Sequence, residues 1–389
     1  MALQSSGAIS LDDIHIELDA TSGTTVSLND SDVRGLIGKS AGATMSMNEW
    51  YGASNTTYVA ASGGSTTTSG NYKYHYFTSS GTFNITSTAN GGPSNTIDYI
   101  IIAGGGSGGT GQYNGGRIGT GGGAGGYRTG TFSASTGSKS ITVGAGGATP
   151  SSNLSRYGGN NSSIGGVASA TKGGGGGYYR GSPYWANVNP ESGGSGGGGN
   201  TFQGSYDGQQ GGEAGGAGTS GQGNAGTTGS AINYNFGSQW FGLAGSGGGG
   251  GKGGQGTRNS IWVYQSGQTV YYSQKGGAGS TTGAANYNGA SRGGGGGGSC
   301  YYSKFSAPNS SNRPWGGNGG TSNASGGGQG SIHTQRYTMS GGYFNLAQAA
   351  SSGSANTGGG GGGGIQGSPS NRRGGAGGSG IVMLRYQYQ

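Results

Sequence analysis

Residues 104–109 match two sequence patterns that carry chemistry in other proteins. They read Gly-Gly-Gly-Ser-Gly-Gly, which fits the G-x-G-x-x-G pattern of a dinucleotide site and the G-x-S-x-G pattern of a nucleophile elbow. Both sites require a helix directly after the glycines, because that helix holds the phosphates or follows the nucleophile. Here more glycine follows, and residues 193–197 match the elbow pattern equally well. Such matches arise readily in a glycine-rich chain, so we expect a protein that is not an enzyme.

The potential metal ligands are far apart in the sequence. His15, His75 and His333 have no ligand spacing with Cys300 or with the acids, so we expect no metal site and no cofactor. No apolar run approaches the roughly 20 residues of a membrane helix, and no signal peptide is visible. We therefore expect synthesis in a cytoplasm and no membrane insertion, and we expect no nucleic-acid partner.

Aromatic and basic residues cluster between the glycine runs and have the chemistry of a binding surface. Tyr and Trp provide a large contact area at low entropic cost and stack on sugar faces, while Arg and Lys pair with phosphates or acidic sugars. In the alternative interpretation the aromatic side chains pack against the rest of the chain and the bases serve solubility. The candidate binding residues are Tyr178, Tyr179, Arg180, Tyr184, Trp185, Trp240, Phe241, Trp262, Tyr264, Tyr271, Tyr272, Tyr301, Tyr302, Lys304, Trp315, Arg336, Tyr343 and Phe344.

Composition limits the elements that could carry these residues. Glycine makes up 105 of the 389 residues, prolines number 7, and charged residues are 8% of the chain. Collagen needs far more proline and a glycine at every third position, and glycine weakens helix interiors. We therefore expect a fold that is mostly β and irregular, with almost no α-helix.

Glycine content and charge both change near residue 60. Residues 1–60 hold 6 glycines and a formal charge of −5, while the remainder holds 99 glycines and a charge of +13. Two shifts at one boundary indicate two modules. We expect a docking module at 1–60, a β-rich core at 61–145 completed by a strand at 381–388, and a glycine-rich tip at 146–380.

The N-terminal module repeats a Ser-apolar-Asp/Asn-acid pattern that begins at Ser10, Ser27 and Ser46. Each copy fits a capping box, in which the Ser oxygen and the acid satisfy amides at a helix start. The second copy predicts a helix from about Asp30 to Ile37, ended by Gly38. The module is either a turn-rich mini-domain or a docking module completed by a partner. The docking candidates are Leu11, Ile14, Leu28, Arg34, Ile37, Trp50 and Tyr51.

Residues of the expected core show the period-two pattern of strands. Tyr72, Tyr74 and Tyr76 alternate with polar neighbours, and a mainly apolar run spans 97–102. The chain closes with Ile-Val-Met-Leu-Arg-Tyr at 381–386, which is also strand-like. We expect this last strand to pair with the first ones, so that the intervening glycine-rich region is carried on the core.

The longer glycine runs allow two interpretations. They could be flexible linkers, or extended helices of the polyproline-II type whose backbone groups hydrogen-bond to neighbouring helices. Only glycine permits so close an approach, at an entropic cost that many runs must share. The segments between runs are rich in large side chains, which linkers lack, so we favour an ordered polyglycine-II lattice. The runs are 173–177, 196–199, 247–251, 293–298 and 358–364.

Four glycine-rich segments resemble the glycine-rich domain of bacteriophage tail-fibre and appendage proteins. They include Asp-Tyr-Ile-Ile-Ile-Ala-Gly-Gly-Gly at 98–106 and Gly-Gly-Tyr-Arg-Thr-Gly at 125–130, together with 141–147 and 377–386. The N-terminal segments are similar to those that begin phage virion structural proteins. These segments lie at 8–15, 26–30, 34–38 and 48–52.

The alternation of glycine runs with aromatic segments resembles the tip adhesin of T-even-like phages. In that family glycine helices form a sandwich and the loops between them contact the host receptor. The resemblance implies a virion protein, assembled in the host cytoplasm, that docks to tail or fibre proteins through residues 1–60. It implies a cell-surface receptor as partner of the tip, and a homotrimer or a single cap on a trimeric fibre. The alternatives are a head or tail decoration protein without receptor contact, and a non-viral extracellular matrix or ice-binding protein.

Overall fold

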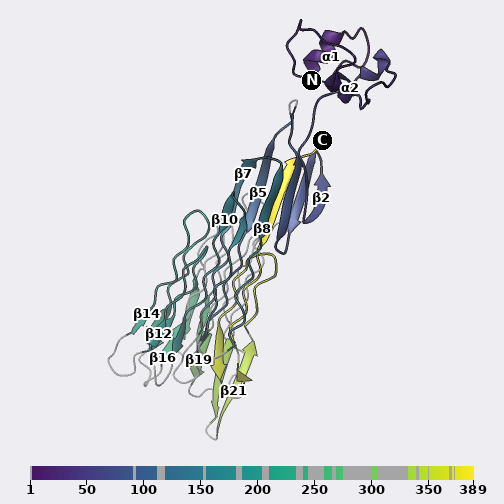
Figure 1. Cartoon of the computed structure of the whole chain (residues 1–389). Coiled ribbons are helices and arrows are strands. Elements are labelled where there is room, and N and C mark those ends of the chain that lie inside the picture. Colours follow the sequence, from purple (N-terminus) through teal and green to yellow (C-terminus); the bar gives the residue numbers. More distant parts are fainter. Residues whose placement is uncertain are drawn as a thin grey trace.

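The chain forms an elongated molecule with both termini near one end (Figure 1). Within the described residues it is mostly β and irregular, and α-helix is confined to two short elements, which confirms the predicted fold class. The computed structural model describes residues 2–90, 93–111, 119–151, 155–180, 186–203, 210–233, 240–243, 258–264, 269–274, 300–304, 332–338, 341–348, 350–367, 370–371 and 373–389.

The N-terminal module has two helices, α1 (Leu11–Glu17) and α2 (Ser31–Leu36), and a 3-10 turn, η1 (Met47–Trp50). Capping boxes are present at Ser10 and at Ser46, as predicted. The box predicted at Ser27 is wrong, because Asp30 precedes α2 and makes no side-chain cap bond. The Asp30 carboxylate instead accepts the N–H of Ser27 at 2.8 Å, which closes the turn before the helix.

Two five-stranded sheets pack face to face below this module. The last strand, β24, lies between β3 and β5 and is antiparallel to both, which confirms the expected pairing. Alternate residues point between the sheets, where Phe83, Ile101 and Leu384 are fully buried. In sheet order, one sheet is β1 (Ala60–Ser62), β4 (Gly81–Ser87), β8 (Gly137–Thr142), β9 (Ser162–Ile164) and β10 (Ala168–Ala170). The other is β2 (Ser65–Ser69), β3 (Tyr72–Phe77), β24 (Ile381–Gln387), β5 (Thr96–Ile102) and β7 (Tyr127–Ser133).

Glycine runs continue directly from the strands of this sandwich, and β5 leads into residues 104–109. Donors three residues apart in this run address the same neighbour. Gly104 and Ser107 donate their N–H groups to the segment 157–160, at 3.0 and 2.8 Å. Gly105 and Gly108 donate to Gly378 and Gly375, and Gly106 and Gly109 donate to Gly123 and Thr120, each at 2.9 Å. Three residues per turn is the period of the polyproline-II helix.

The carbonyl groups of the same run show the same period. Gly104 and Ser107 accept from Gly173 and Gly176, Gly106 and Gly109 accept from Gly361 and Gly364, and Gly105 accepts from Gly147. The run is therefore surrounded by other runs, as in a hexagonal array. This arrangement confirms ordered polyglycine-II helices for 173–177, 196–199 and residues 359–363 of the run 358–364, and makes the linker interpretation wrong for them. The ends of that last run differ, because Gly358 stands in a turn with φ +66° and Gly364 begins a β-strand. The runs 247–251 and 293–298 lie outside the described residues.

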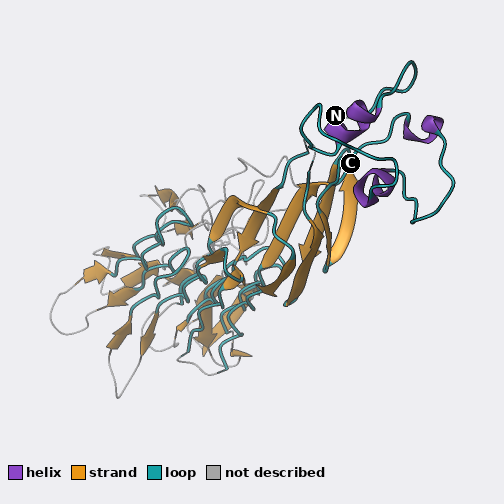
Figure 2. Ribbon diagram, turned by 45° about the horizontal axis from the view of Figure 1, so that its top comes forward, coloured by secondary structure: helices purple, strands orange, loops and turns teal. Residues whose placement is uncertain are grey.

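The lattice requires glycine because neighbouring backbones touch. A Cβ added at Gly106 would lie less than 3.0 Å from the carbonyl oxygen of Gly174, and one at Gly108 would meet Gly362 equally closely. Real Cβ atoms do not approach backbone oxygens so closely. Figure 2 shows the lattice as a bundle of irregular backbone between the sandwich and a second group of strands.

The strands of the far end mostly join neighbours in sequence. Two-stranded sheets are formed by β11 (Tyr178–Arg180) with β12 (Ala186–Val188), β13 (Thr201–Gln203) with β14 (Gln210–Gly212), and β17 (Arg258–Tyr264) with β18 (Thr269–Gln274). A five-stranded sheet contains β15 (Ser230–Asn233), β16 (Trp240–Leu243), β19 (Cys300–Lys304), β20 (Ile332–Thr338) and β21 (Gly341–Gln348). A three-stranded sheet contains β23 (Ser370–Asn371), β22 (Gly364–Gly367) and β6 (Thr110–Gly111).

Candidate functional site

The candidate binding residues that the structure describes lie at the end of the lattice opposite both termini. Figure 1 places β12, β14, β16, β19 and β21 there. The family resemblance implies loops here, but most of the candidates stand in strands. The reason is local, because Tyr, Trp, Phe, Val and Ile are favoured in β-strands and glycine is not. We call these strands, β11 to β21, the distal strands.

Backbone register shows which candidates come together. Trp262 lies directly opposite Tyr271 in the β17–β18 hairpin. Arg336 lies between Lys304 on one side and Tyr343 on the other, in the five-stranded sheet. That sheet collects candidates from four segments of the sequence: Trp240 and Phe241, Tyr301 and Tyr302 with Lys304, Arg336, and Tyr343 with Phe344.

The remaining candidates are distributed over the hairpins. Tyr178, Tyr179 and Arg180 form β11, and the side chain of Tyr178 is buried, with 8% exposed. Tyr264 and Tyr272 stand in β17 and β18 beside the pair already named. Tyr184, Trp185 and Trp315 lie outside the described residues.

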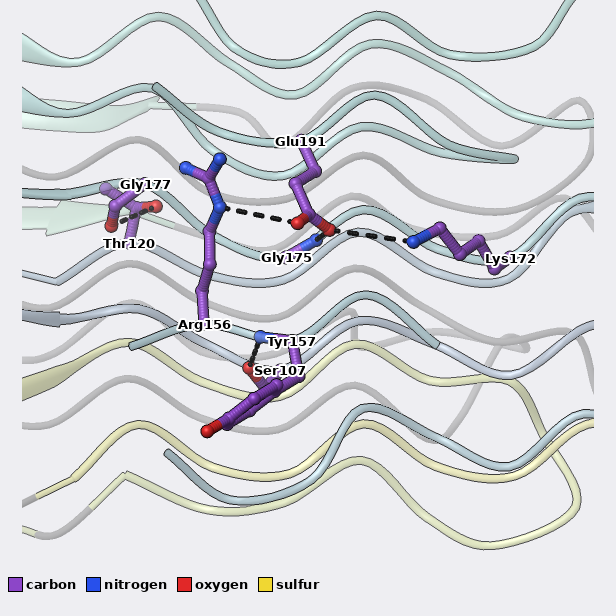
Figure 3. Close-up of polar contacts among 8 residues, drawn as sticks. All are labelled: Ser107, Thr120, Arg156, Tyr157, Lys172, Gly175, Gly177 and Glu191. Carbon is purple, nitrogen blue, oxygen red and sulfur yellow. Dashed lines mark hydrogen bonds and ion pairs between the residues drawn. The ribbon is translucent and has the colours of Figure 1, made fainter. Parts of the chain in front are cut away.

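Polar side chains inside the lattice link neighbouring runs, and they are not among the candidates chosen from the sequence. Ser107 is fully buried, and its Oγ accepts the N–H of Tyr157 at 2.9 Å (Figure 3). Thr120 is fully buried too, and its Oγ1 lies 2.6 Å from the carbonyl oxygen of Gly198. The available signal was the isolated hydroxyl residue within a glycine run, which also occurs at Ser195.

Glu191 is the most connected charged residue in the close-up of the lattice (Figure 3). Its carboxylate accepts the N–H of Gly175 at 3.2 Å. The same group pairs with Arg156 Nε at 3.6 Å and with Lys172 Nζ at 4.0 Å. Here a side-chain oxygen accepts a glycine N–H, whereas inside the lattice a backbone carbonyl of a neighbouring run does so.

The docking candidates are mainly the internal core of the N-terminal module. Ile14 and Trp50 are fully buried, and Leu11, Leu28 and Ile37 pack against them. Arg34 is buried and donates to the carbonyl oxygens of Asn29 and Ser40, both at 3.1 Å. Among the docking candidates, Tyr51 is exposed, with 39% of its surface accessible. Two large exposed apolar residues that the sequence analysis did not select are Ile16 and Met47.

Carboxylates of this module stabilise its own turns. Hydrogen bonds from Gly23 N–H and the Ser22 hydroxyl lower the pKa of Asp12. Bonds from the Ser10 hydroxyl and N–H lower the pKa of Asp13. A bond from Lys39, followed by one from Ser46, lowers the pKa of Glu49. Much of the negative charge therefore serves local structure.

His75 is the buried titratable histidine of the sandwich. Its Nδ1 lies 2.6 Å from the carbonyl oxygen of Gly63, and its Nε2 lies 3.2 Å from the hydroxyl of Tyr386. Burial lowers the pKa of His75 and raises that of Tyr386. The rings of Phe83 and Tyr386 pack on the imidazole. This network ties the turn after β1 to the last strand.

Residues 104–109, which match the dinucleotide-site and nucleophile-elbow patterns, lie inside the lattice. The N–H groups of residues 104–109, which a phosphate site would need, donate to carbonyl groups of neighbouring runs. Among the described residues no cluster of three His, Cys, Asp or Glu could hold a metal ion. No helix in that part of the chain is long and apolar enough to cross a membrane.

A family model described as a glycine-rich domain matches residues 78–312. The chain therefore belongs to this glycine-rich domain family. No curated protein matches the chain. The match covers strands of the sandwich, most of the lattice and several distal strands.

Proposed function

We propose that this chain is a bacteriophage tail-fibre or appendage adhesin that binds a receptor on the bacterial surface. The observation that supports the proposal is the separation of the two ends by a hydrogen-bonded lattice (Figure 1). Because the backbone groups of the lattice are paired between runs, the distal strands stand on a stiff base. Preorganisation of this kind lowers the entropic cost of binding.

The chemistry of the distal strands suits a glycan or lipopolysaccharide receptor. Trp262 and Tyr271 stand opposite each other, and Arg336 stands next to Lys304 in register. Aromatic rings stack on sugar faces, and guanidinium groups bind phosphates and acidic sugars. The charge of +13 on residues 61–389 speeds the encounter with an anionic surface and makes it sensitive to salt.

In this proposal the N-terminal module attaches the chain to the virion. Its contact surface is centred on the exposed residues Ile16, Met47 and Tyr51 rather than on the buried candidates. The virion partner covers these exposed apolar side chains. A buried core residue such as Ile14 is not accessible to a partner.

A binding assay with purified full-length chain on a panel of bacterial strains tests the proposal. We expect saturable binding to a subset of strains at low salt, and a loss of about tenfold or more for Trp262→Ala with Tyr271→Ala. Tyr157→Ala is the matched control, because Tyr157 is exposed and belongs to a lattice run rather than to a distal strand, so the change should leave binding unchanged. Absence of binding to every strain, or equal losses for both variants, would contradict a receptor-binding tip.

A further inference from the structure

The backbone hydrogen bonds of the lattice do not by themselves define a unique register. In a helix with three residues per turn, a shift of three residues returns every N–H and C=O to an equivalent position. The run 193–199 illustrates this, since Gly196 and Gly199 donate to Asn224 and Thr227 while Ser195 and Gly198 donate to Ala124 and Gly121. Moved by one turn, its glycines would meet the same kind of partner.

Runs attached to the sandwich take their register from its strands. Residues 104–109 follow β5, and residues 374–380 precede β24, so a shift would pull buried strand residues to the wrong face. The run 193–199 has no such anchor, because it lies between the distal strands β12 and β13. Its register must be fixed by side chains of the segment itself: Ser195 within the run, whose Oγ accepts the N–H of Asn224 at 3.4 Å, and the residues at its two ends.

The side chains that flank this run would clash with neighbouring backbone if the run moved by one turn. A forward shift of three residues would put Pro190 at the position of Gly193 and Glu191 at that of Gly194. A Cβ at either position would lie less than 3.0 Å from backbone atoms of Lys172 or Gly126. A backward shift would put Asn200 at the position of Gly197, where a Cβ would meet the carbonyl oxygen of Gly175.

Glu191 is also held at its position by direct contacts. Its N–H donates to the carbonyl oxygen of Gly175 at 2.9 Å, and its own carbonyl accepts from Gly197 at 3.0 Å. Its carboxylate binds the N–H of Gly175 and pairs with Arg156 and Lys172 (Figure 3). About a third of the carboxylate side chain is exposed (32%), so the ion pairs contribute modestly and the steric fit dominates.

We propose that Glu191, with Pro190 and Asn200, is a positioning residue that sets the register of run 193–199 and so fixes where the β11–β12 hairpin returns to the lattice. One turn of slip would move three residues, about 9 Å of chain, from one side of the lattice to the other. The consequence for receptor binding rests on the proposed function, whereas the register itself does not.

Hydrogen exchange followed by mass spectrometry on peptides from 186–203 tests the register directly. Pro190→Gly combined with Glu191→Gly removes the forward stop, and we expect two isotopic envelopes that report two registers. Glu191→Ala and Glu191→Gln keep a Cβ at the stop, so each should give one envelope. Of these two variants, Glu191→Ala alone removes the acceptor for the Gly175 N–H. Exchange of that amide, followed in peptides that contain residues 173–177, should then become about fivefold faster.

Two results would overturn the proposal. One is a single envelope with unchanged protection of residues 193–199 in the double glycine variant. The other is two envelopes in Glu191→Ala, which remains informative if the double variant does not fold. A residue that only stabilises the fold would shift one envelope uniformly. Because exchange is read on the free chain, failure of receptor binding leaves this test unaffected.

Discussion

The β-sandwich is stabilised by buried apolar side chains, whereas the glycine lattice is stabilised by backbone hydrogen bonds between residues that have no side chain. In the sandwich, Phe83, Ile101 and Leu384 remove apolar surface from water, and the backbone ladders hold strands at ordinary sheet spacing. In the lattice, Gly106, Gly123 and Gly174 have no side chain, and their N–H groups donate to the next run at 2.8–2.9 Å. The lattice gains little from apolar burial and depends on complete pairing of its backbone.

This difference explains how a chain in which only 29% of the residues are hydrophobic can form an ordered structure beyond its apolar core. The sandwich supplies the register of the runs attached to it, since its strands continue into those runs. The lattice then extends that order toward the distal strands. Removal of a side chain should damage the first region, and addition of a single methyl group should damage the second.

The largest effect is expected for Phe83→Ala in the sandwich. Phe83 is fully buried and packs against His75, Phe77 and Tyr386, so truncation leaves a cavity and costs about 3–5 kcal/mol. Denaturant unfolding of the full-length chain measures the loss. Tyr72→Ala, on a side chain that is 40% exposed, is the control and should change stability far less. Similar losses for both variants would contradict a side-chain core.

A somewhat smaller loss is expected for Gly106→Ala in the lattice. The new methyl would press on the backbone of Gly174, which has no flexible side chain to move aside, at a cost of about 3 kcal/mol. Thermal unfolding by calorimetry measures it. If the variant were as stable as the parent chain, neighbouring runs could not be in backbone contact.

The stability of the sandwich and that of the N-terminal module should depend on pH in different ranges. His75 is held neutral by burial, while the unfolded chain takes up a proton near 6.5, so stability falls as the pH drops below 6.5 until the folded-state pKa is reached. Gly63, Tyr386 and Phe83 face the ring and Lys73 lies on its own strand, so among the described residues that contact His75 no carboxylate offsets this effect. Urea unfolding between pH 7 and 5 should show this slope, and His75→Gln should flatten it.

The module should respond at lower pH. The lowered pKa values of Asp12 and Asp13 contribute stability above their ordinary 3.8, and this is lost only as the pH falls below that value. A loss of module structure, followed by NMR of its residues, that begins near pH 6.5 would contradict this assignment.

The smallest effect, and one of opposite sign, is expected for Gly35→Ala. Gly35 lies within α2, and a Cβ there would meet nothing within 4 Å. Alanine should stabilise this helix by about 0.5–1 kcal/mol. Local exchange of α2 amides in the intact chain measures the gain. Destabilisation would show that α2 is packed differently on its open side.

Much of the fold could be predicted from the sequence because it depends on local signals. A period-two pattern identified β3, an apolar run identified β5, and the apolar ending identified β24. Both ends of the helix predicted from Asp30 to Ile37 agree with α2 to within one residue, although the predicted capping box does not form. The neighbours of each glycine run could not be predicted, because glycine carries no side chain that specifies a partner. The supporting role of Glu191 was missed for the same reason, since it depends on which runs meet.

The candidate site was predicted less completely. The aromatic segments were identified by composition, but their strand pairing, such as Arg336 between Lys304 and Tyr343, joins residues that are distant in sequence. In the N-terminal module the same apolar pattern marks core and contact residues alike. Burial alone separates Ile14 from Tyr51.

Amide exchange of lattice glycines tests the central claim most directly. Gly106 donates to Gly123, Gly123 to Gly174 and Gly174 to Ser195, so three successive amides link four runs. If the lattice is ordered, exchange at these positions should be slower than in an unstructured peptide by a factor of about 1,000 or more, as in a folded core. Exchange at the rate of an unstructured peptide would contradict the account and leave the distal strands without a rigid support.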